Sequence, residues 1–183
     1  DNLGLYARRR QSLSYVTGEY TAILDSDDYW TSPTKLASQV DFLENHKDHV
    51  VVGTMTKLID AAGKDLGTCS FAPSDTEIRK RILIRNQFTH SSILIRTEAL
   101  KHTGGYQPTL AEDLELILQL GKLGQMANLA SYATAHRVHS DSENDHGLKM
   151  VGAVHQIIFN YRNFYPNYPL ARGKSYLRLS WLK

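Results

Sequence analysis

Short segments rich in β-branched and aromatic residues alternate with amphipathic segments along this chain, and this alternation constrains the fold most strongly. Strands are predicted over residues 20–24, 50–59 and 91–95, and an amphipathic helix is predicted over residues 33–43. This order is typical of an α/β domain with a mostly parallel sheet flanked by helices. At 183 residues, the chain is expected to form one such domain.

The second half of the chain carries weaker signals. Short strands are predicted over residues 126–129 and 132–138, and an amphipathic helix over residues 148–158. Prolines after this helix are expected to end it. We therefore interpret residues 164–183 as a loosely structured basic and aromatic tail, separate from a domain of residues 1–163.

The composition is that of a folded protein. Hydrophobic residues make up 42% of the chain and charged residues 22%, which argues against disorder. No apolar run approaches the ~20 residues that a membrane-spanning helix needs. The single cysteine, Cys69, excludes an internal disulfide and a cysteine metal cluster. One thiol is compatible with a reducing compartment, and we expect a cytoplasmic location.

Charge is divided unevenly along the chain. All 19 acidic residues lie at or before Asp145, whereas the segment from Gly147 onward contains six basic residues and no acidic one. An acidic body and a basic tail predict two surfaces with different partners. Two interpretations of the tail stay open: its aromatic residues pack against the sheet, or the tail contacts the anionic inner face of a membrane. Nucleic-acid binding is not expected, because the acidic body would repel phosphate groups.

An acidic cluster, Asp-Ser-Asp-Asp at residues 25–28, follows the first predicted strand. Ligands bind at this end of the strands in open α/β sheets, and carboxylates suit Mg²⁺ or Mn²⁺. A calcium loop is excluded, because Trp30 and Leu36 stand where it needs glycine and glutamate. The cluster remains compatible with a metal-bridged diphosphate site or with a plain acidic turn. A phosphohydrolase is disfavoured by the residues that follow the second aspartate.

Six ordered segments between Asn2 and Ser142 form a combined pattern. They are Asn2-Leu3-Gly4 with Ala7-Arg8, Thr17-Gly18-Glu19-Tyr20 leading into residues 24–30, Pro33 with Lys35-Leu36 and Gln39-Val40, His90-Ser91-Ser92, Gly104-Gly105-Tyr106 with Glu112-Asp113, and Arg137-Val138-His139 with Ser142. Together they resemble the family-2 glycosyltransferases, which are inverting enzymes of the GT-A fold. In relatives, strands that hold the nucleobase precede the Asn-x-Gly segment, so the resemblance implies a GT-A-like domain that is N-terminally incomplete.

The resemblance also implies a function. It implies a metal-dependent inverting hexosyltransferase that moves a sugar from a nucleotide-sugar donor, with UDP as the expected nucleotide. The acceptor would be a growing glycan or a lipid-linked sugar in cell-envelope polysaccharide biosynthesis. The alternative is a non-catalytic, transferase-like interaction module. An unpaired sheet edge also leads us to expect self-association into a homo-oligomer.

On the donor side, the resemblance assigns the metal and the diphosphate. Asp27 is the first expected ligand of Mn²⁺ or Mg²⁺, and His139 would either complete the metal's shell or contact a phosphate. Asp25 lies beside them and would reach either the metal or the ribose. Arg8 and Arg137 are expected to contact the nucleotide-sugar.

On the acceptor side, Asp113 is the expected general base, and Glu112 is the second choice or an acceptor contact. The two residues would equally suit a helix N-terminus, where acidic side chains complement the helix dipole. Trp30 and His90 are expected near the acceptor. Trp30 could also be an ordinary core residue.

Overall fold

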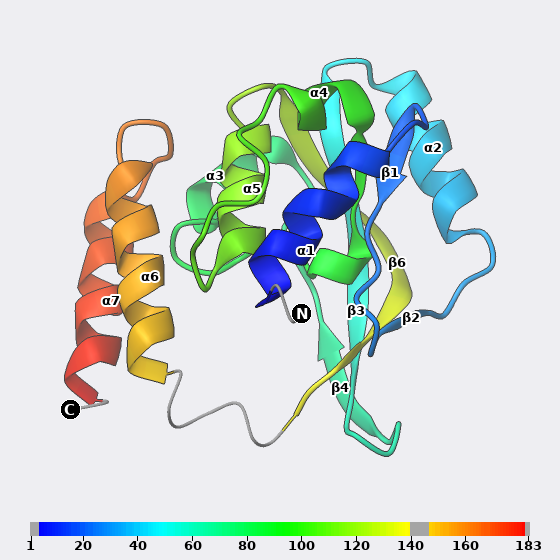
Figure 1. Ribbon diagram of the computed structural model, residues 1–183. Helices are drawn as coiled ribbons and strands as arrows, with labels where there is room; N and C mark the ends of the chain where they lie inside the picture. Colours follow the sequence, from blue (N-terminus) through cyan, green and yellow to red (C-terminus); the bar gives the residue numbers. More distant parts are fainter. Residues whose placement is uncertain (1–3, 140–146, 182–183) are drawn as a thin grey trace.

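A curled, six-stranded sheet forms the centre of the molecule in the computed structural model, which describes residues 4–139 and 147–181 (Figure 1). The strand order is β1-β5-β3-β6-β2, and β4 pairs with β3 outside this path. The strands are β1 (Tyr20–Ala22), β2 (Tyr29–Trp30), β3 (His49–Ile59), β4 (Asp65–Cys69), β5 (Leu94–Arg96) and β6 (Gln125–Arg137). The helices are α1 (Gly4–Ser12), α2 (Lys35–Asn45), α3 (Asp75–Arg81), α4 (Thr97–Lys101), α5 (Glu112–Leu120), α6 (Gly147–Asn160) and α7 (Tyr168–Trp181), with 3-10 turns η1 (Leu13–Tyr15) and η2 (His90–Ser92).

The predicted α/β class is confirmed, but the prediction of a mostly parallel sheet is wrong. Among the described strands, β3 and β6 pair in parallel, and the other four pairings are antiparallel. The reason lies in the connection from β3 to β5. It contains the β3–β4 hairpin and the seven-residue helix α3, so it returns the chain antiparallel to β3 instead of forming a parallel crossover.

The two faces of the sheet bury different helices. Val51 and Ile95 belong to the larger core cluster, which also contains residues of α3 and α5. Their neighbours Val52 and Leu94 belong to a smaller cluster with Leu43 of α2. Adjacent strand residues point to opposite faces, so this alternation lets one central sheet support a helix layer on each side.

The sequence predicts two strands where the structure has the single strand β6. The register between β3 and β6 shifts on both sides of Met55, where residues 129, 132 and 134 of β6 meet three consecutive residues of β3. A bulge of this kind interrupts the residue pattern but not the strand.

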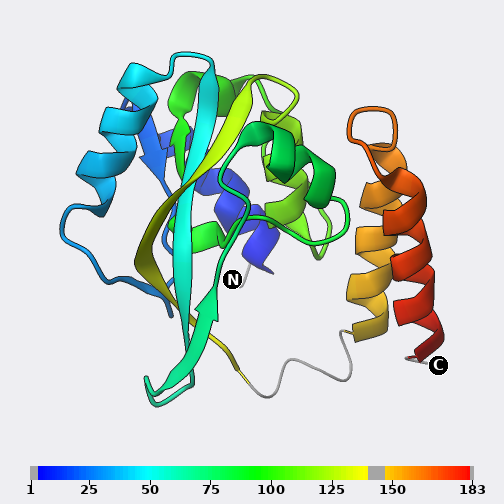
Figure 2. The same cartoon turned by 180° about the vertical axis from the view of Figure 1, so that it is seen from behind.

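The C-terminal region is a helical hairpin, which corrects the prediction of a loosely structured tail. Pro169 stands in the first turn of α7, where a missing backbone N–H costs nothing. The Tyr165 hydroxyl donates a hydrogen bond to the Leu118 carbonyl at 2.7 Å, and Ala171 is buried in the larger core cluster. Seen from behind, α6 and α7 lie together beside the body of the domain (Figure 2). The domain division near residue 163 stays a prediction. In the described part of the chain, no helix has both the length and the apolar character to cross a membrane.

Candidate functional site

The acidic loop of residues 25–28 follows β1 and is held in place by its last residue. The Asp28 carboxylate accepts hydrogen bonds from the Ser91 hydroxyl at 2.5 Å, from the Arg137 backbone N–H at 2.9 Å and from His136 Nδ1 at 3.1 Å. Burial alone would raise the pKa of Asp28, but these hydrogen bonds outweigh it and lower the pKa. Asp28 therefore fastens the loop to β6 and η2.

Asp25 is turned toward two partners. Arg9 Nη2 lies 2.5 Å from Asp25 Oδ1, and His90 Nδ1 lies 3.3 Å from Asp25 Oδ2. Partial burial opposes the charged form, but the interactions with His90 and Arg9 prevail and lower the pKa of Asp25 to about 2. Asp25 is thus a carboxylate that stays ionised across the physiological pH range.

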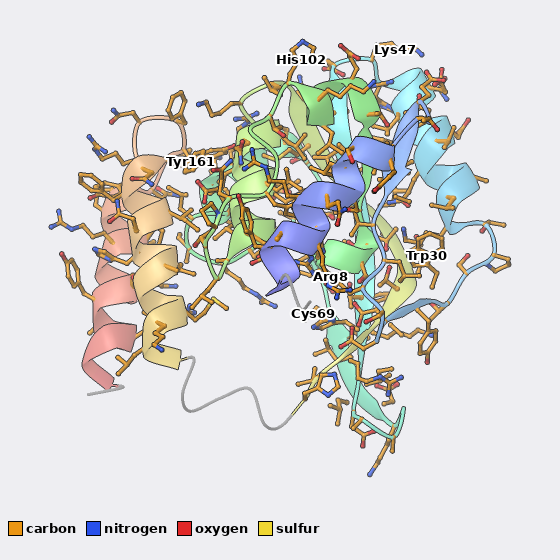
Figure 3. The ribbon with its side chains drawn as sticks, viewed as in Figure 1. Arg8, Trp30, Lys47, Cys69, His102 and Tyr161 are labelled. Atoms are coloured by element: carbon orange, nitrogen blue, oxygen red, sulfur yellow. The ribbon has the colours of Figure 1, made fainter. Side chains whose placement is uncertain are left out.

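Arg9 connects the acidic loop to the start of α5. Its Nη1 lies 2.5 Å from Glu112 Oε1, and its guanidinium carbon lies 5.8 Å from the centre of the Tyr106 ring. Arg8, the arginine expected from the sequence, has an exposed side chain on α1, where Figure 3 labels it. The sequence does not show which of the three consecutive arginines at residues 8–10 faces the carboxylates, because the direction of each side chain depends on how α1 packs.

Asp27 and His139 form a separate pair. Asp27 Oδ2 lies 2.9 Å from His139 Nε2, and both side chains are about half exposed, at 43% and 51%. Arg137 Nε donates to the Asp27 carbonyl at 3.0 Å, and its Nη1 donates to the carbonyls of Asp60 and Ala61. Arg137 therefore braces the loop from the end of β6.

Asp27 and His139 fit part of a divalent-cation site. In the described part of the chain, no three histidine, cysteine or acidic side chains gather closely enough to hold a metal. Asp25 does not join the pair, because its carboxylate faces Arg9 and His90. The Asp27 carboxylate suits Mn²⁺ or Mg²⁺, whereas the His139 imidazole suits these ions less well. Cations of this kind take their remaining ligands from substrate phosphates and water.

Glu112 and Asp113 start α5 but have different environments. Glu112 is 6% exposed and ion-paired to Arg9. Asp113 is half-buried, and its Oδ2 accepts a hydrogen bond from the side-chain amide of Asn86 at 3.1 Å. Asp113 also lines a cavity, so it is the better placed of the two to meet a substrate. Asn86 has no sequence motif around it that would have indicated this contact.

Trp30 and His90, both expected near the acceptor, have different surroundings in the structure. His90 is buried between Asp25 and the Tyr106 hydroxyl, with Nε2 2.9 Å from that oxygen. The Trp30 indole N–H donates to the Ser91 carbonyl at 3.0 Å, and Lys35 Nζ lies 4.6 Å from the centre of the Trp30 ring. His90 therefore belongs to the network around Asp25, and Trp30 packs behind it.

His136 was not singled out from the sequence. Its hydrogen bond with Asp28 raises the pKa of its imidazole and outweighs partial burial, which acts in the opposite direction. The one sequence feature that could have indicated a role for His136 is its position directly before the Arg137-Val138-His139 segment. Ser142, the last residue of that segment, lies outside the described residues.

Comparisons with known proteins identify the family of this chain. Residues 1–103 match the family described as Glycosyl transferase family 2. The amylovoran biosynthesis glycosyltransferase AmsE of Erwinia amylovora is 29% identical over 145 residues, which cover 78% of this chain and 54% of AmsE. The chain thus spans about half the length of this relative.

Solved structures show a similar fold. S. aureus TarS 1–349 has a TM-score of 0.65 at 16% identity, over 97% of this chain and 52% of TarS 1–349. The mannosyltransferase PcManGT from Pyrobaculum calidifontis, in complex with GDP-Man and Mn²⁺, has a TM-score of 0.61 at 14% identity, over 97% of this chain and 54% of that protein. These likenesses confirm the GT-A-like fold expected from the sequence.

Proposed function

We propose, because this chain belongs to glycosyl transferase family 2, that it carries the catalytic residues of an inverting transferase that uses a nucleotide-sugar donor. One observation supports this most directly: the loop after β1 meets the start of α5, although Asp28 and Glu112 are 84 positions apart in the sequence. Arg9 contacts Asp25 and Glu112 at 2.5 Å each, which supports a single site built from the donor-side and base-side motifs.

The donor diphosphate would lie against Asp27, Arg137 and His139. Arg137 and His139 can donate hydrogen bonds to phosphate oxygens, and Asp25 can accept one from a ribose hydroxyl. Mn²⁺ or Mg²⁺ held by Asp27 and His139 would supply charge neutralisation for the departing nucleoside diphosphate. UDP is the expected nucleotide, and GDP is included in the tests because the similar PcManGT was solved with GDP-Man and Mn²⁺.

Asp113 would act as the general base. It would accept the proton of the acceptor hydroxyl as the oxygen forms its bond to the anomeric carbon. The bond from that carbon to the diphosphate breaks, and its electron pair leaves with the diphosphate on the opposite side, which inverts the anomeric configuration. The Asn86 amide, 3.1 Å from Asp113, would keep the carboxylate oriented toward the hydroxyl.

The acceptor is a glycan or a lipid-linked sugar, and the protein acts in the cytoplasm at the inner face of the membrane. Exposed leucines and basic residues on α7 support peripheral membrane contact. In the described sheet, β1 pairs only with β5, and this edge could join a second copy of the chain.

Calorimetric titration tests the donor assignment. UDP and GDP are each titrated into the wild-type chain with Mn²⁺ and with excess chelator. We expect binding of one nucleotide that requires the metal and is lost in Asp27→Ala. Asp41→Ala, which removes an exposed carboxylate from α2, is the control and should bind as the wild type does. If neither nucleotide binds, the chain is a non-catalytic module and the proposal is wrong.

A further inference from the structure

A cavity of about 300 Å³ lies between the body of the domain and the α6–α7 hairpin. Asp113 forms part of its wall, together with residues of the segment that precedes η2. Met150 and Val154 of α6 and Arg178 of α7 form another part. Both cartoon views place α6 beside the body near α5 (Figures 1 and 2). The hairpin therefore helps to enclose a space next to the proposed base.

The walls of this space are largely apolar. A second, smaller cavity of about 90 Å³ has Ile84, Met150 and Val154 in common with the first and continues between α6 and α7 to Ala171. We refer to the two together as the hairpin groove. Apolar walls favour an apolar ligand, because burying its surface removes that surface from water.

The groove also carries positive charge. Arg85 and Arg178 line the larger cavity, and Lys174 lines the smaller one. Asp113 is the one carboxylate among the described lining residues, and no ion pair joins Arg85 or Arg178 to a carboxylate of the described chain. Arg85 Nη2 donates a hydrogen bond to Cys69 Sγ at 3.4 Å. The guanidinium group of Arg178 suits the oxygens of a phosphate, which it can bind with two hydrogen bonds.

We infer that the hairpin groove binds the acceptor, and that the acceptor is an amphiphile in which a phosphate joins a saccharide to an apolar chain. A sugar hydroxyl would meet Asp113, the phosphate would meet Arg178, and the apolar chain would pack on Ile84, Met150 and Val154. This inference rests on the proposed function, because it names the acceptor of the same site. A free glycan fits less well, since its polar surface would desolvate against the apolar wall without a hydrogen-bonding partner.

The three methionines of the chain make the groove directly observable. Met55 and Met126 are 8% and 0% exposed in the core, whereas Met150 is 38% exposed at the groove. In the full chain labelled with ¹³C at the methionine methyls, Met150→Leu identifies the Met150 resonance. Decyl phosphate, added below its micelle concentration, should shift this resonance saturably and leave the other two in place.

Arg178→Gln should weaken the affinity for decyl phosphate by about tenfold, since a hydrogen bond between charged groups is lost. Arg172→Gln is the matched control, because Arg172 is an exposed arginine on the same helix whose guanidinium contacts Tyr176. Its affinity should remain that of the wild type.

Three results would overturn the inference. In the first, decyl phosphate leaves the Met150 resonance unmoved. In the second, neutral decyl glucoside or inorganic phosphate binds as tightly as decyl phosphate does. In the third, Arg178→Gln and Arg172→Gln lose affinity for decyl phosphate equally. The nucleotide titration separates this inference from the proposed function. If a nucleotide binds in a metal-dependent way but decyl phosphate does not shift the Met150 resonance, only the acceptor assignment of the groove is refuted. If decyl phosphate binds but no nucleotide does, the proposed transferase function is refuted and the groove remains a site for amphiphiles.

Discussion

At the scale of single residues, the site depends on how its charges are shared. Arg9 is the central cation, because it neutralises a loop carboxylate, Asp25, and a helix carboxylate, Glu112, at the same time. Asp27 and Asp113 are left more accessible than their acidic neighbours, at the two positions where a substrate would need them. Adjacent acidic residues thus take different roles because their surroundings differ.

The near-isosteric change Asp113→Asn separates catalysis from binding. We expect the affinity for the donor nucleotide to stay within a few-fold of the wild type, while kcat falls by about 10² or more, because the base is lost but the shape remains. Steady-state kinetics combined with nucleotide titration measures both quantities. Collapse of nucleotide affinity with an unchanged kcat would show instead that Asp113 serves binding.

The lowered pKa of Asp25 predicts how its contribution to stability changes with pH. The pKa of Asp25 is about 2 in the folded state, below the ordinary value of about 3.9. The ionised carboxylate therefore stabilises the folded state above pH ~4, and this stabilisation is lost as the pH falls toward the folded-state pKa. Asp25→Asn should therefore lower the free energy of unfolding at pH 7 by on the order of 2 kcal/mol.

Urea unfolding of the wild type and of Asp25→Asn at several pH values measures this effect. The difference between the two proteins should shrink steadily below pH ~4. A difference that is the same at neutral and at acidic pH would mean that the ion pairs of Asp25 do not stabilise the fold.

At the scale of elements, the parallel pair β3–β6 organises the molecule. It carries Asn128 and Thr134 in the core, and its far end delivers His136 and Arg137 to the acidic loop. The strand β3 must pass close to its neighbours to do so. A Cβ added to Gly53 would lie 2.2 Å from Asn128 Oδ1 and 2.8 Å from a ring carbon of Phe88.

Two glycine-to-alanine changes test this packing with opposite expected signs. Gly53→Ala should destabilise the protein by about 1–3 kcal/mol, because buried neighbours must move. Gly152→Ala in α6, where nothing lies within 4 Å of the added carbon, should stabilise it by about 0.5–1 kcal/mol through helix propensity. Thermal or urea unfolding measures both, and a Gly53→Ala variant as stable as the wild type would contradict the close contact.

At the scale of the whole molecule, the α6–α7 hairpin lies next to the start of α5, because Asp113 shares a cavity with Met150, Val154 and Arg178. The hairpin is joined to the body by the hydrogen bond from Tyr165 to Leu118 and by Lys122, whose Nζ lies 4.1 Å from the centre of the Phe164 ring. Its outer surface still exposes Leu170 by 53% and Leu177 by 61%. An amphiphilic acceptor and a membrane surface would be reached from this same hairpin.

Vesicle co-sedimentation tests the membrane contact of the hairpin. The full chain should bind anionic vesicles at low salt and release them at high salt, because screening weakens the attraction of basic residues to the lipid headgroups. Leu170→Ser with Leu177→Ser should reduce binding several-fold. Leu66→Ser, an equally exposed leucine on β4, is the control and should change nothing. Equal binding to neutral and anionic vesicles would contradict the electrostatic part of the prediction.

The sequence by itself determined the features that depend on neighbouring residues. The 3.6-residue repeat of Leu36, Val40 and Leu43 identified the face of α2 that packs on the sheet, and the acidic loop was correctly placed after a strand. The ordered motifs were sufficient to identify the family. These signals are local, so they survive without knowledge of the rest of the fold.

Only the tertiary structure decided the features that depend on distant partners. Strand direction could not be predicted, because the residue pattern of β5 marks a strand but not its neighbour. The choice of Arg9 over Arg8, the enclosure of Asp28 by His136 and the folding of residues 168–181 into a packed helix each require contacts with segments far along the chain. Burial, strand pairing and ion pairing depend on residues that are distant in the sequence, so the local residue pattern does not predict them.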